Sequence, residues 1–155
     1  MIVVISGHDK SYEPLAEWTL HKNKKHYCDK HGYKLHYAND CGASIAGKPM
    51  MAAPRPPIPD THIPMGWGKI FLIKEAMTHY PEATWFFNTD CDVMITNMER
   101  KLEDIIKENA QENTHILIPA DANGINCGNM LIRNTQIGKA CLITIISVMP
   151  RYRHW

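Results

Sequence analysis

Two aspartates one residue apart are the side chains of this sequence whose type and spacing most directly suggest chemistry. Asp90 and Asp92 follow the apolar pair Phe86-Phe87 and enclose Cys91. Alternate side chains of an extended segment point to the same side, so the two carboxylates can face one small volume, where their charges repel. A divalent cation relieves this repulsion, and Mn²⁺ and Mg²⁺ accept carboxylate and phosphate oxygens together. The pattern predicts a metal site at Asp90 and Asp92 for a metal-bound diphosphate, as in a nucleotide sugar. The alternative is that both are turn residues that cap the helix that follows.

The elements that would hold these aspartates alternate between strands and helices. Hydrophobic periodicity predicts strands over residues 2–6, 33–38, 83–89, 116–119 and 130–132, and helices over residues 13–31, 67–80, 98–108 and 138–148. Gly32 and Pro81 are typical helix ends, and the proline-dense segment 39–64 predicts a loop. Such alternation implies an α/β fold, a Rossmann-like, mostly parallel sheet with helices on both faces. Ligands bind these sheets at the carboxyl ends of the strands, which is where Asp90 and Asp92 stand.

Composition argues against several classes of function. With 155 residues and 45% hydrophobic side chains, the chain is long enough for one globular domain with a core. Its formal net charge of +1 argues against a nucleic-acid binder and against a polybasic membrane anchor. We find no apolar run near the ~20 residues of a membrane span and no signal peptide at the start of the sequence. The five cysteines include no Cys-x-x-Cys pair, which indicates a reducing compartment, so we expect a cytoplasmic protein.

Four blocks of the sequence extend the motif. One block reads His79-Tyr80-Pro81-Glu82-Ala83-Thr84-Trp85 and leads into the two aspartates; the others are residues 26–33, 67–70 and 121–134. The block 26–33 is similar to a Tyr-Ala-x-x-His-Gly-Tyr element, and the block 67–70 to a Trp-x-Lys helix start. The block that begins at His79 is similar to a His-Pro-Glu-x-x-Trp turn before Asp-x-Asp, and the block 121–134 to an Asn-x-Gly-x-x-x-x-Arg-Asn element. Together the blocks resemble glycosyltransferase family 34, which contains galactosyl- and xylosyltransferases.

The resemblance implies a GT-A fold, a nucleotide-sugar donor, with UDP favoured, and a manganese-like metal. Carried over by position, Asp92 is the direct metal ligand. Asp90 contacts the ribose or sugar of the donor or shares the metal, and Cys91 is the variable residue between them. Lys69 lies near the diphosphate or the donor sugar, where its charge is useful; a solvated helix lysine is the alternative.

The nucleotide base and ribose usually lie at the end of the first strand in this fold. Ser6, Gly7 and His8 end the first predicted strand, and the glycine permits close approach of the backbone to a ligand. A turn glycine without a ligand is the alternative. Tyr12 is a candidate to stack on the base.

The activity implied by the resemblance is a retaining transfer of sugar from a nucleotide-diphosphate sugar to a hydroxyl of a carbohydrate or glycoconjugate acceptor. Asp121 and Asn126 are candidates to contact the sugar, because an amide side chain both donates and accepts hydrogen bonds. Family members continue past this point with an acidic-Gln element and a late histidine. We therefore expect residues 1–155 to be a single nucleotide-sugar-binding domain, incomplete at its C-terminus. The alternatives are a remnant that binds the donor without turnover, and a generic α/β domain whose aspartates are structural.

Overall fold

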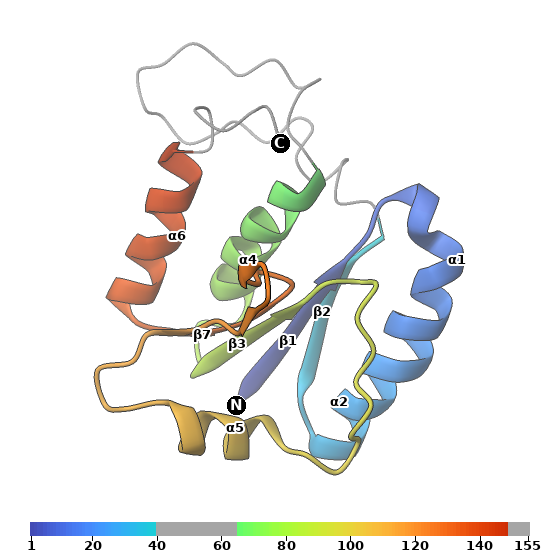
Figure 1. Ribbon diagram of the computed structural model, residues 1–155, viewed down its shortest axis with the longest axis horizontal. Helices are drawn as coiled ribbons and strands as arrows, with labels where there is room; N and C mark the ends of the chain where they lie inside the picture. The colour runs from blue at the N-terminus through green and yellow to red at the C-terminus, as the bar shows by residue number, and fades with distance from the viewer. Residues whose placement is uncertain (40–64, 149–155) are drawn as a thin grey trace.

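A computed structural model describes residues 1–39 and 65–148 of the chain. Residues 40–64, which carry most of the predicted loop, and residues 149–155 lie outside the described part. The described residues form one five-stranded sheet with strand order β2-β1-β3-β7-β4, a small two-stranded sheet, and helices on both faces of the larger sheet (Figure 1). The α/β fold expected from the alternating pattern is thus confirmed.

The sheet combines a parallel half with an antiparallel half. The parallel strands are β2 (Lys34–Ala38), β1 (Ile2–Gly7) and β3 (Trp85–Thr89); β7 (Asn129–Arg133) pairs antiparallel with β3, and β4 (Ile116–Leu117) antiparallel with β7. Between β4 and β7 the chain makes only the hairpin of β5 (Ala120–Asp121) and β6 (Gly124–Ile125). A parallel pair would need a long crossover there, usually a helix, so the short connection makes these two strands antiparallel.

The predicted first helix is continuous but changes its geometry. After a 3₁₀ turn, η1 (Lys10–Tyr12), the chain forms α1 (Glu13–Ala16), a π-helical segment η2 (Glu17–Lys24) and α2 (Lys25–His31). It ends, as predicted, at Gly32, whose φ of 72° is left-handed. The π-helical segment was not expected from the sequence, because its i→i+5 hydrogen bonds have no local sequence signature.

The later helices follow the periodicity with one change. They are α4 (Gly68–His79), preceded by the 3₁₀ turn η4 (Met65–Trp67), α5 (Leu102–Asn109) and α6 (Gln136–Val148). The helix predicted to begin at residue 98 begins at Leu102 instead. Asn97 Oδ1 accepts hydrogen bonds from the backbone N–H groups of Glu99 (3.0 Å) and Arg100 (3.2 Å), so a turn held by this side chain replaces the first helical turn.

Each face of the sheet buries its own core. Along β1, Val3 and Ile5 face α4 and α6, whereas Ile2 and Val4 face α2 and α5, and none is more than 4% exposed. The α4 face also buries Ile70, Ile73, Met77, Phe86, Ile132 and Leu142; the α2 face buries Tyr27, Cys28, Tyr33, Trp85, Leu102 and Leu131. This two-sided burial explains why β1 reads as a continuous apolar run.

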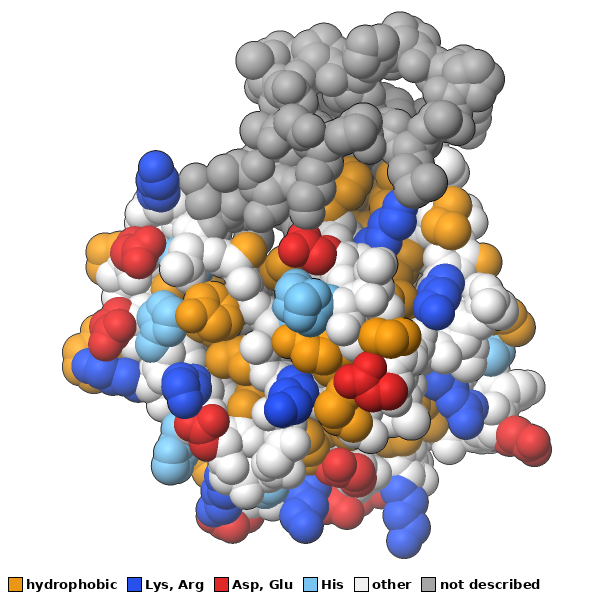
Figure 2. Space-filling view, turned by 180° about the vertical axis from the view of Figure 1, so that it is seen from behind, with side chains coloured by type: hydrophobic (Ala, Val, Ile, Leu, Met, Phe, Trp, Pro, Cys, Tyr) orange, Lys and Arg blue, Asp and Glu red, His pale blue; other side chains and the backbone are white. Residues whose placement is uncertain are grey.

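The surface carries no strong charge bias on the side drawn in Figure 2, where acidic and basic side chains are interspersed. This distribution accords with the near-zero net charge of the sequence. Among the helices of the described residues, none has the length and apolar character needed to cross a membrane.

Candidate active site

A cavity of about 220 Å³ lies where β1 and β3 end and α4 begins. Its lining comes from these three elements, the turns after β1 and β3, and the turn before α4: Gly7, His8, Asp9, Tyr12, Gly66, Lys69, Asn88, Asp90, Cys91 and Asp92. The two central parallel strands thus open onto it at their carboxyl ends, the position where α/β sheets bind ligands. We call this cavity the strand-end pocket.

The residues predicted from sequence for the donor side all line the strand-end pocket, except Ser6. Ser6 is 1% exposed and does not line the cavity. Three lining residues, Asp9, Gly66 and Asn88, were not predicted. Asn88 lies opposite Ile5 in the β1–β3 pairing, which brings it to the same site as His8. No local sequence pattern predicts this strand register, so the sequence alone did not indicate Asn88.

Lys69 and Asp90 form the closest ion pair of the pocket. Lys69 Nζ lies 2.6 Å from both carboxylate oxygens of Asp90 and donates a further hydrogen bond to the carbonyl oxygen of Cys127 (3.3 Å). The side chains are 19% and 33% exposed, so the pair is partly shielded from water. Asp92, by contrast, is exposed and makes no hydrogen bond or ion pair with another described residue. Of the two carboxylates, Asp92 is the one that has no partner among the described side chains.

Several buried polar atoms at the strand ends have no hydrogen-bond partner among the described residues. They include Ser6 Oγ, His8 Nε2, Asn88 Nδ2 and Thr89 Oγ1. His8 Nδ1 donates to the carbonyl oxygen of Asp9 (2.8 Å), which leaves Nε2 of the neutral ring as an acceptor. Buried polar groups normally have a hydrogen-bond partner, so His8 and Asn88, which line the pocket, retain one unused acceptor and one unused donor among the described residues.

Asp121 and Asn126, predicted to contact a sugar, do not line the strand-end pocket. Asn126 Nδ2 donates to Asp121 Oδ2 (2.8 Å), and Asn126 Oδ1 accepts from the N–H of Gly128 (2.8 Å). The carbonyl oxygen of Gly128 in turn accepts from the N–H of Asp90 (2.8 Å). The two side chains therefore shape the loop after β6, which is tied to Asp90 through Gly128.

Burial and charge change the ionisation of two groups below the aspartates. Burial, helped by the negative charge of Asp92, raises the pKa of the Cys91 thiol. Burial lowers the pKa of Lys24 to about 8, although Cys91, Asp92 and Asp90 act in the opposite direction. Without a metal ion, Cys91 is therefore a neutral thiol at neutral pH.

The residues present fit a hard divalent cation. Within residues 1–39 and 65–148, no group of three or more His, Cys, Asp or Glu side chains is placed to hold a metal ion. Asp90 and Asp92 supply carboxylate oxygens only, and Mg²⁺-like ions are commonly held by one or two carboxylates together with phosphate oxygens of the substrate. The donor set thus suits a metal that arrives with, or is completed by, a diphosphate.

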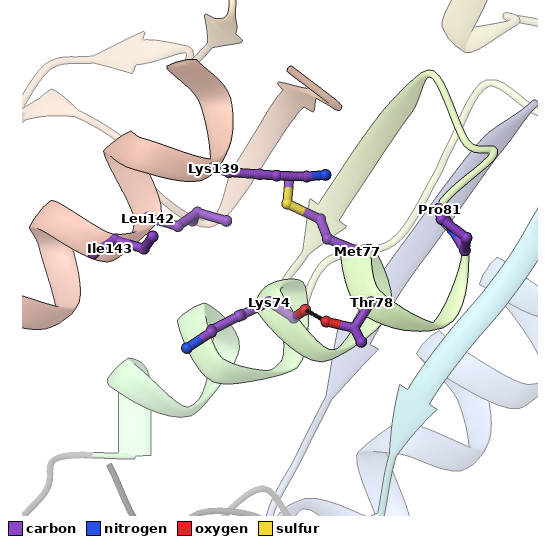
Figure 3. A pocket seen from close by; sticks show the side chains of 7 residues that line it. All are labelled: Lys74, Met77, Thr78, Pro81, Lys139, Leu142 and Ile143. Carbon is purple, nitrogen blue, oxygen red and sulfur yellow. Dashed lines mark hydrogen bonds between the residues drawn. The ribbon is translucent and has the colours of Figure 1, made fainter. Parts of the chain in front are cut away.

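A second cavity, of about 280 Å³, lies between α4 and α6 (Figure 3). Its walls are Lys74, Met77, Thr78, Pro81, Lys139, Leu142 and Ile143. It is larger than the strand-end pocket, but no carboxylate or imidazole of the described residues lines it. Its hydroxyl group, Thr78 Oγ1, donates a hydrogen bond to the carbonyl oxygen of Lys74 (3.1 Å). Of these two cavities, the strand-end pocket is the one lined by carboxylates and an imidazole.

Comparison with known proteins places this site in a family context. The galactosyl transferase GMA12/MNN10 family, which is glycosyltransferase family 34, matches residues 1–111. The match includes the first three sequence blocks and the strand-end pocket. The fourth block, residues 121–134, lies beyond it.

Three curated relatives are similar along most of this chain. An uncharacterized alpha-1,2-galactosyltransferase of Schizosaccharomyces pombe is 27% identical over 88% of this chain and 42% of its own length. A probable alpha-1,6-mannosyltransferase of Saccharomyces cerevisiae is 24% identical over 81% of this chain and 36% of its own. Galactomannan galactosyltransferase 1 of Cyamopsis tetragonoloba is 26% identical over all of this chain and 34% of its own. The chain thus spans less than half the length of these relatives.

A crystal structure of a glycosyltransferase involved in the glycosylation of the major capsid of PBCV-1 shares the fold. It aligns with a TM-score of 0.68 and 20% identity over 95% of this chain and 66% of that chain. The GT-A-like architecture expected from the sequence is therefore confirmed. Since the family match covers residues 1–111 of the 155, the chain belongs to the galactosyl transferase GMA12/MNN10 family.

Proposed function

We propose that this protein binds a nucleotide-diphosphate sugar, with UDP favoured, in the strand-end pocket through a divalent cation and transfers the sugar to a hydroxyl acceptor. One observation carries the proposal: side chains from three segments distant in sequence line the same cavity. They are His8 after β1, Lys69 on α4, and Asp90 and Asp92 after β3, with Lys69 paired to Asp90. Family membership supports the same reading. The cavity is smaller than the ~300–1,000 Å³ of pockets that enclose a drug-sized ligand, so the described residues enclose part of such a donor.

Asp92 would hold the cation, Mn²⁺ or Mg²⁺. Asp90 would hold it too once its ion pair with Lys69 has opened. Bound there, it would neutralise the charge that develops on the departing diphosphate. Lys69, once separated from Asp90, would carry its charge to the diphosphate as well. Lys69 would thus pair with Asp90 in the free protein and with the diphosphate in the complex. Because the move of Lys69 to the diphosphate frees Asp90 for the cation, we expect metal and nucleotide to bind together.

The nucleoside would lie at the end of β1. His8 Nε2 accepts and Asn88 Nδ2 donates, and a ribose hydroxyl does both, so the pair matches such a group. Tyr12 is 48% exposed at the rim of the cavity and is available to stack on the base.

The proposed transfer breaks the bond between the anomeric carbon and the phosphate oxygen, whose electron pair stays with the phosphate. The acceptor hydroxyl oxygen forms the new bond to the anomeric carbon, and its proton goes to the departing phosphate oxygen. We favour attack from the face of the leaving group, which retains the anomeric configuration. The sugar is proposed to be a hexose or pentose, and the acceptor a carbohydrate or glycoconjugate. The cytoplasmic location expected from the sequence stays a prediction.

The test is isothermal titration of the chain with UDP and with GDP, each with Mn²⁺ and with a chelator, for the wild type and Asp92→Ala. Asp29→Ala is the control, because Asp29 is an exposed carboxylate that pairs with Lys25 on α2. We expect Mn²⁺-dependent binding of one nucleotide, lost in Asp92→Ala and kept in Asp29→Ala. Incubation with UDP-galactose or GDP-mannose and a sugar acceptor then separates a transferase from a remnant that binds without turnover. Binding that is indifferent to Mn²⁺ and to Asp92 would contradict the proposal.

A further inference from the structure

A buried lysine lies directly beneath the two aspartates. Lys24, the last residue of η2, has a side chain that is 0% exposed. No described carboxylate forms an ion pair with it, although lysine is almost never fully buried without a partner. A buried ammonium must be compensated by hydrogen bonds and nearby charge, so its acceptors indicate why it is there.

Two of its three acceptors flank Asp92. Lys24 Nζ donates to the carbonyl oxygens of Val93 (2.5 Å), Cys91 (3.3 Å) and Thr19 (3.3 Å). Thr19 belongs to the same helical segment, so the other two bonds cross from η2 to the turn after β3. The ammonium thus holds the carbonyl groups of the two residues next to Asp92.

The preceding residue holds the next part of the same turn. Asn23 Nδ2 donates to the carbonyl oxygen of Ile95 (3.0 Å), and Asn23 Oδ1 accepts from the N–H of Ile95 (2.7 Å). Two successive residues of η2 therefore reach residues 91–95. The i→i+5 bonding seen at the end of η2, where the N–H of Lys25 donates to the carbonyl oxygen of Leu20, places both side chains toward the turn.

The charges agree with this geometry. Asp92 and Asp90 both favour the ammonium form of Lys24, and Lys69 already pairs with Asp90. One positive charge therefore lies below the turn and another beside it, opposite two carboxylates. Lys24 does not line the strand-end pocket, so it cannot touch a ligand there.

We propose that Lys24 is a positioning residue that fixes the peptide groups around Asp92 and so directs the Asp92 carboxylate into the strand-end pocket. Its effect on the turn depends only on the contacts above. Its effect on metal-dependent nucleotide binding rests on the proposed function. Asn23 assists it at Ile95.

The experiment compares Lys24→Met with two controls. Lys25→Met removes the adjacent lysine, which is exposed and pairs with Asp29 (2.7 Å), so the charge change is the same. Ile73→Val trims a fully buried side chain of the α4 face and lowers stability without touching the turn. The readouts are amide hydrogen exchange over residues 90–96 and UDP affinity with Mn²⁺ and with a chelator.

In Lys24→Met we expect exchange at Val93 and Ile95 to rise at least tenfold more than in Ile73→Val, while the β1 amides follow the global change in stability. We expect UDP affinity to fall about tenfold with Mn²⁺ and to change little with the chelator. Lys25→Met should match the wild type in both readouts. If Lys24→Met does not fold, Lys24→Gln, which keeps one donor group, replaces it, with a smaller effect in the same direction.

Exchange over residues 90–96 that rises no more than in Ile73→Val would overturn the proposal. So would an equal loss of UDP affinity with Mn²⁺ and with the chelator, because a positioning role for Asp92 acts only through the metal. If the wild type itself shows no Mn²⁺-dependent binding, the proposed function fails, and hydrogen exchange alone decides the role of Lys24.

Discussion

Replacing Lys69 by methionine should change metal and nucleotide binding in opposite directions. In the structure Lys69 Nζ lies 2.6 Å from both oxygens of Asp90, and so occupies the position beside this carboxylate that a divalent cation would take. Lys69→Met removes the ammonium group that competes with a metal ion for Asp90. The carboxylates of Asp90 and Asp92 then have no ammonium of a described side chain beside them in the pocket. A cation should therefore bind the variant more tightly, whereas a diphosphate loses a positive charge.

The magnitude follows from the exposure of the pair. Exposed ion pairs contribute ~0–1 kcal/mol, and breaking a buried pair costs ~3–5 kcal/mol. With side chains 19% and 33% exposed, the Lys69–Asp90 pair lies between, and we expect a loss of about 1–2 kcal/mol of unfolding free energy in the absence of metal. For a chain of this size that is a fall in Tm of roughly 2–8 °C. A gain of ~1.4 kcal/mol in cation binding corresponds to a tenfold tighter Kd.

The assay is thermal unfolding with increasing Mn²⁺, without and then with UDP. Lys74→Met is the matched control, because Lys74 is on the same helix and lines the other cavity. We expect Mn²⁺ alone to stabilise Lys69→Met more than the wild type, and Mn²⁺ with UDP to stabilise it less. If Mn²⁺ alone raises the Tm of the variant no more than that of the wild type, Lys69 does not compete for Asp90 and the reasoning is refuted.

Two further predictions concern the supports of the site and of the core. Gly128→Ala should cost about 0.5–1.5 kcal/mol in urea unfolding. The added Cβ would lie 2.9 Å from Asn126 Oδ1 and would displace this oxygen from its hydrogen bond with the N–H of residue 128. An unchanged unfolding free energy would show that this hydrogen bond does not support the loop. Burial raises the pKa of Cys28 to about 12 from 9.0. Above pH 9 the thiol therefore loses its proton in the unfolded chain but keeps it in the folded protein, so the free energy of unfolding falls as the pH rises. Relative to Cys28→Ala, the wild type should lose up to about 1.4 kcal/mol per pH unit between pH 9 and the folded pKa, measured by urea unfolding; parallel pH curves for the two proteins would disprove this.

Local patterns predicted much of the fold because local physics decides those parts. The helix from residue 13 ends at Gly32 because this residue adopts a left-handed conformation. The hydrophobic periodicity of residues 67–80 predicted α4, and Ile70, Ile73 and Met77 form the face of it that packs on the sheet. The strand that leads into Asp90 was predicted from its apolar run, and its carboxyl end does open onto a pocket.

The rest depends on contacts between segments far apart in the sequence. Asn23 and Lys24, at the end of η2, bond to the turn at residues 91–95, roughly 70 residues later, so the burial of Lys24 depends on a contact that no local pattern indicates. β7 runs antiparallel to β4 because the connection between these two strands contains no crossover helix. Asn88 reads as an ordinary strand residue until its pairing with Ile5 is known. Asp121 and Asn126 bond to each other because the hairpin brings them together.

The central place of β1 in the sheet has a consequence for how the chain folds as it is synthesised. β1 pairs with β2 on one side and with β3 on the other, and β3 ends about 80 residues after β1. At about 5–20 residues per second, the ribosome needs roughly 4–16 s to add that length. During this interval the apolar strand Ile2–Gly7 has one edge without its native partner, a state that favours pairing with other chains. Nascent chains of this protein should therefore depend on chaperones until Thr89 has emerged, and slower translation over that stretch should increase aggregation rather than relieve it.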